Sequence, residues 1–402
     1  MSVSSQTEDV GGGALPTLAL PAAEREVRDL VRDTVAQHVA PRAAEVDADS
    51  IFPDAGLRAL AQAGLAGLLM PEHLGGSGHS TLAYVVAMEE IASACGSTST
   101  LYMTQMHSAY PILIAGEEAQ RSRWIPSLCD GSALGSLAVT EPAAGSDVAA
   151  MRTTARRDGR GYVISGTKTF ITTGNRADVI VLFASLDTTA GRDGITAFLI
   201  ERGTPGLVAG PPMHKLGMRG SCTAELFLDT CHVSADCRLG PEGGGWALSM
   251  QSVVKSRLSA AAQGVGLARG ALEAAIRWAS NQGLTRGSRG RAQDVQFTLA
   301  EASARVAAAR ALLHGAAQLA DTGGGDLVPT ISMAKLMCTD CAMDVASKMV
   351  DLLAEEGDLV EHGVERFLRD AKVTQIYDGT NQIQRLLIAR SLPSPTEALD
   401  GH

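Results

Sequence analysis

The sequence predicts an α+β chain in which a helical region is followed by a strand-rich region and then by a second helical region. Two observations lead to this prediction: the spacing of apolar residues changes twice along the 402 residues, and turn residues separate the short runs in the middle. A chain of this length exceeds the usual size of a single core. We place a disordered N-terminal tail at 1–20 and the three regions at 21–136, 137–240 and 241–402.

Apolar residues recur at helical spacing in three segments of the first region. They are Val27, Leu30, Val31 and Val35 in the first segment, Leu57, Leu60, Ala61 and Leu65 in the second, and residues 82–91 in the third. We expect the third helix to end in the Gly- and Ser-rich stretch 95–99.

Short apolar and β-branched runs between turn residues predict strands in the second region. The runs cover 153–157, 162–164, 179–184, 196–200 and 225–228, and Asp158-Gly159 predicts a hairpin turn between the first two. From Gly245 onward the spacing returns to 3.6 residues. It predicts helices over 258–276, 297–320 and 331–353 with a loop at 323–326, and we expect their excess apolar faces to be buried in an oligomer.

The charge balance excludes some partners. With 34 basic and 44 acidic residues, the formal net charge is −10, and no basic run suggests nucleic acid or an anionic membrane as the main partner. The apolar stretches are too short for a membrane span, and residues 1–13 lack the charged and apolar parts of a signal peptide. We therefore expect a cytoplasmic protein without membrane insertion.

Seven cysteines are scattered along the chain. Cys338 and Cys341 form a C-x-x-C, but their apolar helical surroundings favour a packed helix face over zinc binding or redox chemistry. Cys231 and His232 precede a predicted loop and have no companion ligands. We therefore expect no metal site.

The segment 364–390 contains a candidate catalytic carboxylate. It reads VERFLRDAKVTQIYDGTNQIQRLLIAR and places Asp378 at a helix-breaking Gly379-Thr380 step. Apolar residues at helical spacing flank this step: Phe367, Leu368, Ala371, Val373 and Ile376 before it, and Ile383, Leu386, Leu387 and Ile388 after it. Thr380 or Asn381 can cap the second helix. The residues alone leave two interpretations open, a solvated turn and an active-site base.

Two further blocks lie in the strand-rich region: 137–148 reads LAVTEPAAGSDV and 166–175 reads GTKTFITTGN. Each alone is an ordinary turn or strand pattern. In order with 364–390, they resemble the motifs of the flavin-dependent acyl-CoA dehydrogenases, T-E-P-x-x-G-S-D, G-x-K-x-W-I-T-N and R-D-A-K-x-x-Q-I-Y-E-G-T-x-Q-I-Q-R. Asp378 stands where the family has Glu, and Phe170 stands where it commonly has Trp.

The resemblance implies a fold and an activity. The fold is an N-terminal all-α domain, a middle β-barrel or sandwich domain and a C-terminal four-helix bundle, assembled as a homotetramer or homodimer. The activity is FAD-dependent α,β-dehydrogenation of an acyl thioester, with electrons passing to an electron-transfer flavoprotein or to oxygen. Such a reaction needs a base for the Cα proton and an acceptor for the Cβ hydride, which no side chain can be.

The resemblance also implies roles for individual residues. Asp378 would be the base, and its backbone N–H would donate to the thioester oxygen. The residues implied at the flavin are Leu137, Val139, Thr140, Ser146, Phe170, Thr172, Thr380 and Gln382. The residues implied at the substrate are Ser146, Arg257, Tyr377 and Gly379. Two of these residues also have a purely structural interpretation: Phe170 could be an ordinary core aromatic in a strand, and Arg257 could be an exposed charge on a helix.

The base position departs from the family pattern. The carboxylate of Asp378 sits roughly 1.5 Å further back than that of a Glu, because the side chain is one methylene shorter. Some members carry the base on the helix of the Arg257 motif, but the matching residue here is Ser256. Asp378 therefore has no acidic substitute at that position.

Two further departures concern the half of the flavin site that a neighbouring subunit would supply. The family's R-x-x-F-G element aligns with QGLTR at 282–286, and the arginines that could replace its charge are Arg286, Arg289 and Arg291. The Q-x-x-G-G-x-G-Y stretch aligns with DLLAEEGD at 351–358, where Ala354 and Glu355 replace the paired glycines. Acidic side chains beside a diphosphate are unfavourable.

Several functions therefore remain open at this stage. The acyl group is presented either by CoA or by an acyl carrier protein. A different class is carbanion oxidation of the nitroalkane oxidase type, because those relatives place Asp at the base position. A third class is a non-catalytic structural homologue with weakened FAD binding, which the altered segments 282–286 and 351–358 suggest.

Overall fold

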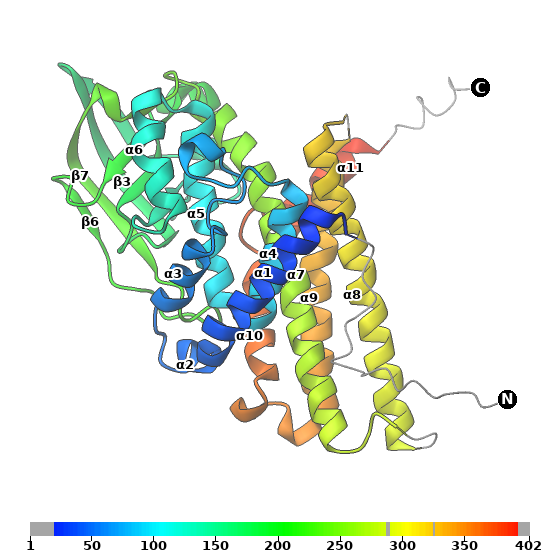
Figure 1. Cartoon of the computed structure of the whole chain (residues 1–402). Coiled ribbons are helices and arrows are strands. Elements are labelled where there is room, and N and C mark those ends of the chain that lie inside the picture. Colours follow the sequence, from blue (N-terminus) through cyan, green and yellow to red (C-terminus); the bar gives the residue numbers. More distant parts are fainter. Residues whose placement is uncertain (1–19, 287–289, 325, 393–402) are drawn as a thin grey trace, which may run out of the picture.

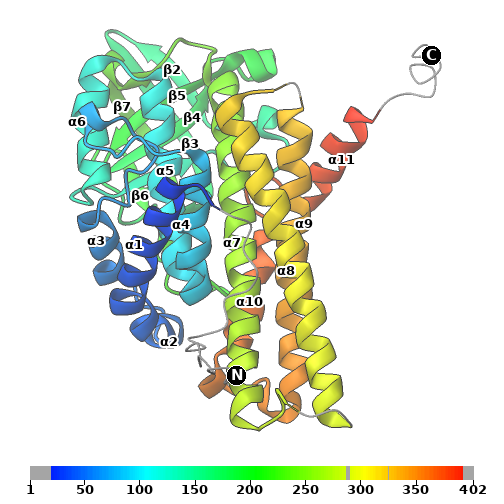
Figure 2. The same cartoon turned by 45° about the vertical axis from the view of Figure 1, so that its right-hand side comes forward.

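The computed structural model describes residues 20–286, 290–324 and 326–392, and it follows the predicted order of helices, strands and helices (Figure 1). The sheet lies on one side of the molecule and the long C-terminal helices on the other (Figures 1 and 2). Of the predicted tail at 1–20, residues 1–19 lie outside the described residues, as does Arg289. The predicted fold class is confirmed.

The N-terminal region is helical. Its helices are α1 (Ala22–His38), α2 (Ala43–Ala48), α3 (Asp54–Gln62), α4 (Thr81–Ala94), α5 (Gly96–Ala115) and α6 (Glu118–Cys129). In α1, Val27, Val31 and Val35 are buried as predicted. Leu30 is 46% exposed, because it lies at the edge of the stripe that these three valines form.

The third predicted helix ends at the stretch 95–99 as expected, because α4 ends at Ala94 with Cys95 as its C-cap, but a further helix that the sequence did not predict, α5, begins at Gly96. Cys95 separates α4 from α5, and its Sγ accepts the N–H of Thr98 at 3.5 Å, the role of an N-cap. Ser99 and Thr100 donate to the carbonyl of Gly96 within the same helix, so their hydroxyls can be buried. Helix α5 packs against α7 and against β1, and it therefore connects the bundle with the sheet (Figure 1).

The middle region is one sheet with the strand order β6-β7-β3-β2-β4-β5-β8, and β1 pairs in parallel with β4. Its strands are β1 (Gly135–Ala138), β2 (Thr154–Asp158), β3 (Gly161–Thr172), β4 (Val179–Ser185), β5 (Ile195–Glu201), β6 (Leu207–Ala209), β7 (Thr223–Ser234) and β8 (Arg238–Leu239). The predicted hairpin turn between β2 and β3 is present, with Gly159 at φ 57°. Cys231 and His232 lie near the end of β7, which ends at Ser234, and both pair with β3.

The C-terminal region contains α7 (Gly245–Asn281), α8 (Arg291–Thr322), α9 (Leu327–Leu353), α10 (Val364–Thr374) and α11 (Asn381–Ser391). Helices α7 and α9 pack closely at Gly264, where a Cβ atom would lie 2.7 Å from the carbonyl oxygen of Cys338. Cys338 and Cys341 are both buried on α9, which confirms the predicted packed helix face. Within the described residues, no helix has the length and apolar character needed to cross a membrane.

The two signature helices differ from the predicted amphipathic pattern. In α10, Phe367 and Ala371 are buried, whereas Ile376 lies beyond the helix end and is 52% exposed. In α11 the buried residues are the polar Asn381 and Gln384, and Leu386 is 52% exposed. Within one copy of the chain, α11 therefore leaves Leu386 exposed, and its buried face carries hydrogen bonds to α9 and to the preceding turn.

Candidate active site

Asp378 lies in the turn between α10 and α11, and the backbone geometry of this turn fixes its position. Asp378 has φ 53° and Gly379 has φ 87°, a left-handed pair that favours glycine at the second position. The Oγ1 atom of Thr380 accepts the N–H of Ile383 at 3.3 Å, so the predicted N-cap of α11 is confirmed. The side chain of Gln384 donates to the carbonyl of Gly379 at 2.8 Å and closes the turn.

Burial governs the charge state of Asp378. The residue as a whole is half-buried, but its Oδ2 atom is cut off from solvent and has no hydrogen-bond partner among the described residues. Burial raises the pKa of this carboxyl above its ordinary value, while the charges of His107, Lys335 and Arg257 and the hydroxyl of Ser256 oppose the rise. A carboxylate with a raised pKa and a free oxygen has the properties of a general base.

Two basic residues flank the turn. Lys335 of α9 is fully buried and donates to Oδ1 of Asn381 at 2.8 Å, and burial lowers its pKa to about 8. Arg257 of α7 is buried, so it is not the exposed helix charge that was the alternative interpretation. Its side chain lies beside Gly379, because a Cβ atom at Gly379 would lie 3.6 Å from its Nε. This Nε has no partner within the described part of the chain. Both cations are therefore held close to Asp378.

A buried polar network continues from the turn into the helical core. The hydroxyl of Tyr377 donates to the side chain of Gln263, whose amide nitrogen donates to Ser99 at 2.7 Å and to Thr100 at 3.0 Å. Its members lie on α5, α7 and the turn, so the network ties the three together. It fixes the ring of Tyr377 next to Asp378.

A second cluster shares the hydroxyl of Ser259 on α7. Tyr84 of α4 lies 2.9 Å from this Oγ, and Nε2 of His107 on α5 lies 3.4 Å from it. Burial lowers the pKa of His107, and the charge of Asp378 acts in the opposite direction. Polar groups from α4, α5 and α7 therefore surround the same side of the site.

The two strand blocks are joined by a buried ion pair that the sequence interpretation missed. Nζ of Lys168 lies 2.8 Å from Oε1 of Glu141 and donates to the carbonyl of Val139 at 3.0 Å. The same carboxylate accepts the backbone N–H groups of Arg152 and Thr153. Burial lowers the pKa of Lys168 to about 8, and Glu141 acts in the opposite direction. The T-E-P and G-x-K positions therefore act as one structural unit.

Phe170 lies on this unit with an unusual backbone. It has φ 56° inside an irregular part of β3 and is 67% exposed, so it is not a core aromatic. A left-handed conformation is rare for a bulky residue and marks a position of functional interest. The N–H of Thr169 donates to the carbonyl of Thr140 at 3.0 Å, which holds the two blocks together beside the ring.

The structure sorts the residues implied by the resemblance into two groups. Arg257, Tyr377, Asp378, Gly379 and Thr380 gather at the turn between α10 and α11, and Gln382 follows as an exposed residue of α11. Leu137, Val139, Thr140, Phe170 and Thr172 gather along β1, β3 and the loop after β1. Ser146 is exposed in that loop, where a Cβ atom at Gly145 would meet nothing within 4 Å. An exposed aromatic ring beside an open loop fits a flat isoalloxazine ring.

The structure also contains residues near Asp378 that the sequence interpretation did not single out. They are Tyr84, His107, Ser259, Gln263 and Lys335. Lys335 stands between apolar residues of a helical run, so only its burial distinguishes it from a surface lysine. The described residues contain no group of three or more His, Cys, Asp or Glu side chains that could hold a metal ion.

Three family models cover nearly the whole described chain. The model of the acyl-CoA dehydrogenase N-terminal domain matches residues 21–132, that of the middle domain matches 136–231, and that of the C-terminal domain matches 243–392.

Individual relatives agree with these models. The chain is 42% identical over 368 residues to cyclohex-1-ene-1-carbonyl-CoA dehydrogenase of Geobacter metallireducens, which covers 91% of this chain and 97% of the relative. The solved structure of butyryl-CoA dehydrogenase from Megasphaera elsdenii superposes with a TM-score of 0.88 at 32% identity, covering 94% of this chain and 99% of that one. The prolyl acyl carrier protein oxidase AnaB gives a TM-score of 0.86 at 31% identity, with 92% and 99% covered.

Proposed function

Because the chain belongs to the acyl-CoA dehydrogenase family, whose members are flavin oxidoreductases acting on CH–CH donors, we propose that it dehydrogenates an acyl thioester between Cα and Cβ. Asp378 removes the Cα proton in this proposal. The observation that supports it most directly is the buried Oδ2 atom of Asp378, which has no protein partner among the described residues and is therefore free to accept a proton. FAD bound at the exposed face of Phe170 would supply the acceptor for the Cβ hydride.

The residues of this chain would prepare the proton transfer in three ways. Burial raises the pKa of Asp378 toward the range in which a carboxylate is an effective base. The positive charges of Arg257 and Lys335 lower the pKa of Asp378 and so oppose the effect of burial, which keeps a fraction of the carboxyl group ionised. The backbone N–H of Asp378 would donate to the thioester oxygen, where negative charge develops when the Cα proton leaves.

We propose that one FAD is bound noncovalently per chain. The support is the group formed by Val139, Thr140, Phe170 and Thr172, held together by the buried pair of Lys168 and Glu141. Purified protein should be yellow and should release FAD on denaturation. A folded, colourless protein that takes up no FAD during incubation would refute the proposal.

The substrate is proposed as an acyl-CoA or an acyl group on a carrier protein. A relative named for a cyclic acyl-CoA and a structural neighbour named for a prolyl carrier protein support the inclusion of cyclic acyl groups. An anaerobic titration with linear, branched and cyclic acyl thioesters on CoA and on carrier protein, followed by flavin bleaching, identifies the class. Bleaching by a nitroalkane but by none of the thioesters would refute the proposed reaction.

We further propose a cytoplasmic homotetramer or homodimer that passes electrons to an electron-transfer flavoprotein or to oxygen. The exposed apolar face of α11, with Leu386 at 52% exposure, supports a contact between copies. All seven cysteines are free, which agrees with a reducing compartment. Light scattering should give a multiple of the chain mass, and a stable flavin-bound monomer at micromolar concentration would refute the assembly.

A further inference from the structure

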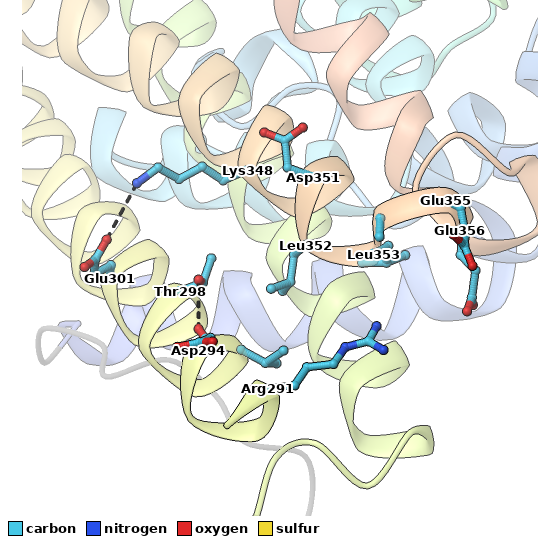
Figure 3. Close-up of a pocket in the computed structure, with 12 residues that line it drawn as sticks. Arg291, Asp294, Thr298, Glu301, Lys348, Asp351, Leu352, Leu353, Glu355 and Glu356 are labelled. Atoms are coloured by element: carbon cyan, nitrogen blue, oxygen red, sulfur yellow. Dashed lines mark hydrogen bonds and ion pairs between the residues drawn. The ribbon is translucent and has the colours of Figure 1, made fainter. Parts of the chain in front are cut away.

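A hollow of about 570 Å³ lies at the end of the bundle (Figure 3). Its walls come from the start of α8, the end of α9 and the following turn at Ala354–Glu356. Arg291 and Ala354–Glu356 both line it. Arg291, a candidate replacement for the missing charge, and the altered stretch around Ala354 and Glu355 therefore meet at one place in the structure, which the sequence alone did not reveal.

The charge of this hollow is negative. Two cationic side chains line it, against five acidic ones, which gives a net charge of −3; the residues are Arg291, Lys348, Asp294, Glu301, Asp351, Glu355 and Glu356. Lys348 lies 3.7 Å from Glu301, as Figure 3 shows, so its charge is already shared with a carboxylate. A diphosphate would bring further negative charge to a site with an excess of carboxylates, which is unfavourable.

Two backbone N–H groups of the turn are already engaged and cannot bind an anion. A phosphate site needs free N–H groups that point at the ligand. The N–H of Ala354 donates to the carbonyl of Asp351, and that of Gly357 donates to the carbonyl of Ala354 at 3.0 Å. The remaining cation, Arg291, lies over the ring of Trp278 at 5.9 Å from its centroid. The residues present at this end of the bundle therefore do not fit a diphosphate.

We infer that FAD binds to this protein without an attractive contact from the hollow between α8 and α9 of any subunit. The affinity for FAD then comes from the group at the strands of one subunit, formed by Val139, Thr140, Phe170 and Thr172. The inference rests on the proposed function, because it concerns how a flavin that is bound is retained. It distinguishes this chain from the pattern that the resemblance implies, in which a neighbouring subunit contacts the diphosphate.

The test follows release of FAD from the holoprotein on serial dilution, by the flavin fluorescence that appears in solution. Three proteins are compared with the parent: Arg291→Gln, the double variant Asp351→Asn/Glu355→Gln, and Phe170→Ala as a variant of the strand side. These hollow residues are exposed, so their substitution leaves the core intact. We expect the dissociation constants of both hollow variants to rise no more than threefold above that of the parent, and that of Phe170→Ala to rise at least about tenfold.

A dissociation constant more than threefold above that of the parent in either hollow variant would overturn the inference, because it would show an attractive contact from this end; tighter binding in the double variant would show repulsion and would support it. Loss of a charge-assisted contact from Arg291 to a diphosphate would weaken binding by roughly tenfold or more, and removal of two carboxylates that face it would tighten binding. A parent protein that neither contains nor binds FAD is a different result. It refutes the proposed function, and the inference falls with it.

Discussion

Replacement of Asp378 by Asn separates the chemistry of the site from its folding. Asn keeps the size of the side chain but cannot take up a proton at neutral pH. The groups whose charges act on Asp378 are His107, Lys335 and Arg257, and none of them is a carboxylate that could replace it. We therefore expect reduction of the flavin by substrate to fall on the order of a thousandfold, within the range for loss of general base catalysis.

Folding and FAD binding should survive this substitution. Burial raises the pKa of Asp378, so the folded protein disfavours its charged form, and removal of that charge should not cost stability. The Oδ2 atom makes no hydrogen bond to any described residue, so none is lost there. We expect the free energy of unfolding to change by less than about 1 kcal/mol, which urea denaturation followed by circular dichroism measures.

The assay is anaerobic stopped-flow reduction of the bound flavin by the best thioester found. In the parent, the rate should fall as the pH drops through the raised pKa of Asp378, because the base becomes protonated. Asp344→Asn serves as a matched control, since Asp344 lies on the exposed side of α9 in an ion pair with Arg305 at 3.5 Å. If Asp378→Asn reduces the flavin at the parent rate, the proton leaves by another route and the proposed role of Asp378 is wrong.

The other predictions concern neighbouring parts of the structure. Asp378→Glu should retain activity, and it should react faster than the parent with ordinary acyl-CoAs if the shorter side chain limits the parent; complete loss of flavin reduction would contradict this. Lys168→Met should lower the free energy of unfolding in urea by about 3 kcal/mol, because it leaves the buried Glu141 unpaired, and an equal loss in the exposed Arg157→Met control would refute that cause. Ala354→Gly should raise stability by about 1 kcal/mol, since φ 53° and ψ −127° suit only glycine; an unchanged urea midpoint would count against it. Burial raises the pKa of Asp370 to about 6, so the folded state holds its proton more tightly than the unfolded state, and stability should fall by about 3 kcal/mol as the pH rises from about 4 to 6. Asp370→Asn should lack this part of the pH dependence, and identical pH profiles of the two proteins would exclude Asp370 as its source.

The sequence by itself determined the order of helices and strands and the family. Hydrophobic spacing depends on residues close together in the chain, so α4, the β2–β3 hairpin and α9 could be predicted from local pattern alone. The N-cap by Thr380 followed in the same way, because a cap needs only the residues of one turn. The start of α5 could not be predicted in this way, because a run of Ser and Thr is typical of a loop in a sequence. Their hydroxyls can be buried in a helix only because they donate to backbone carbonyls of the same helix.

The tertiary structure decided which of these residues share one environment. Lys335 and Arg257 lie on different helices from Asp378, and their effect on its charge depends on packing that brings α7 and α9 to the same turn. The pair of Lys168 and Glu141 joins residues 27 positions apart, and the acidic hollow joins the start of α8 to the end of α9. Burial and electrostatic interaction are properties of distance in space, which a local sequence pattern does not contain.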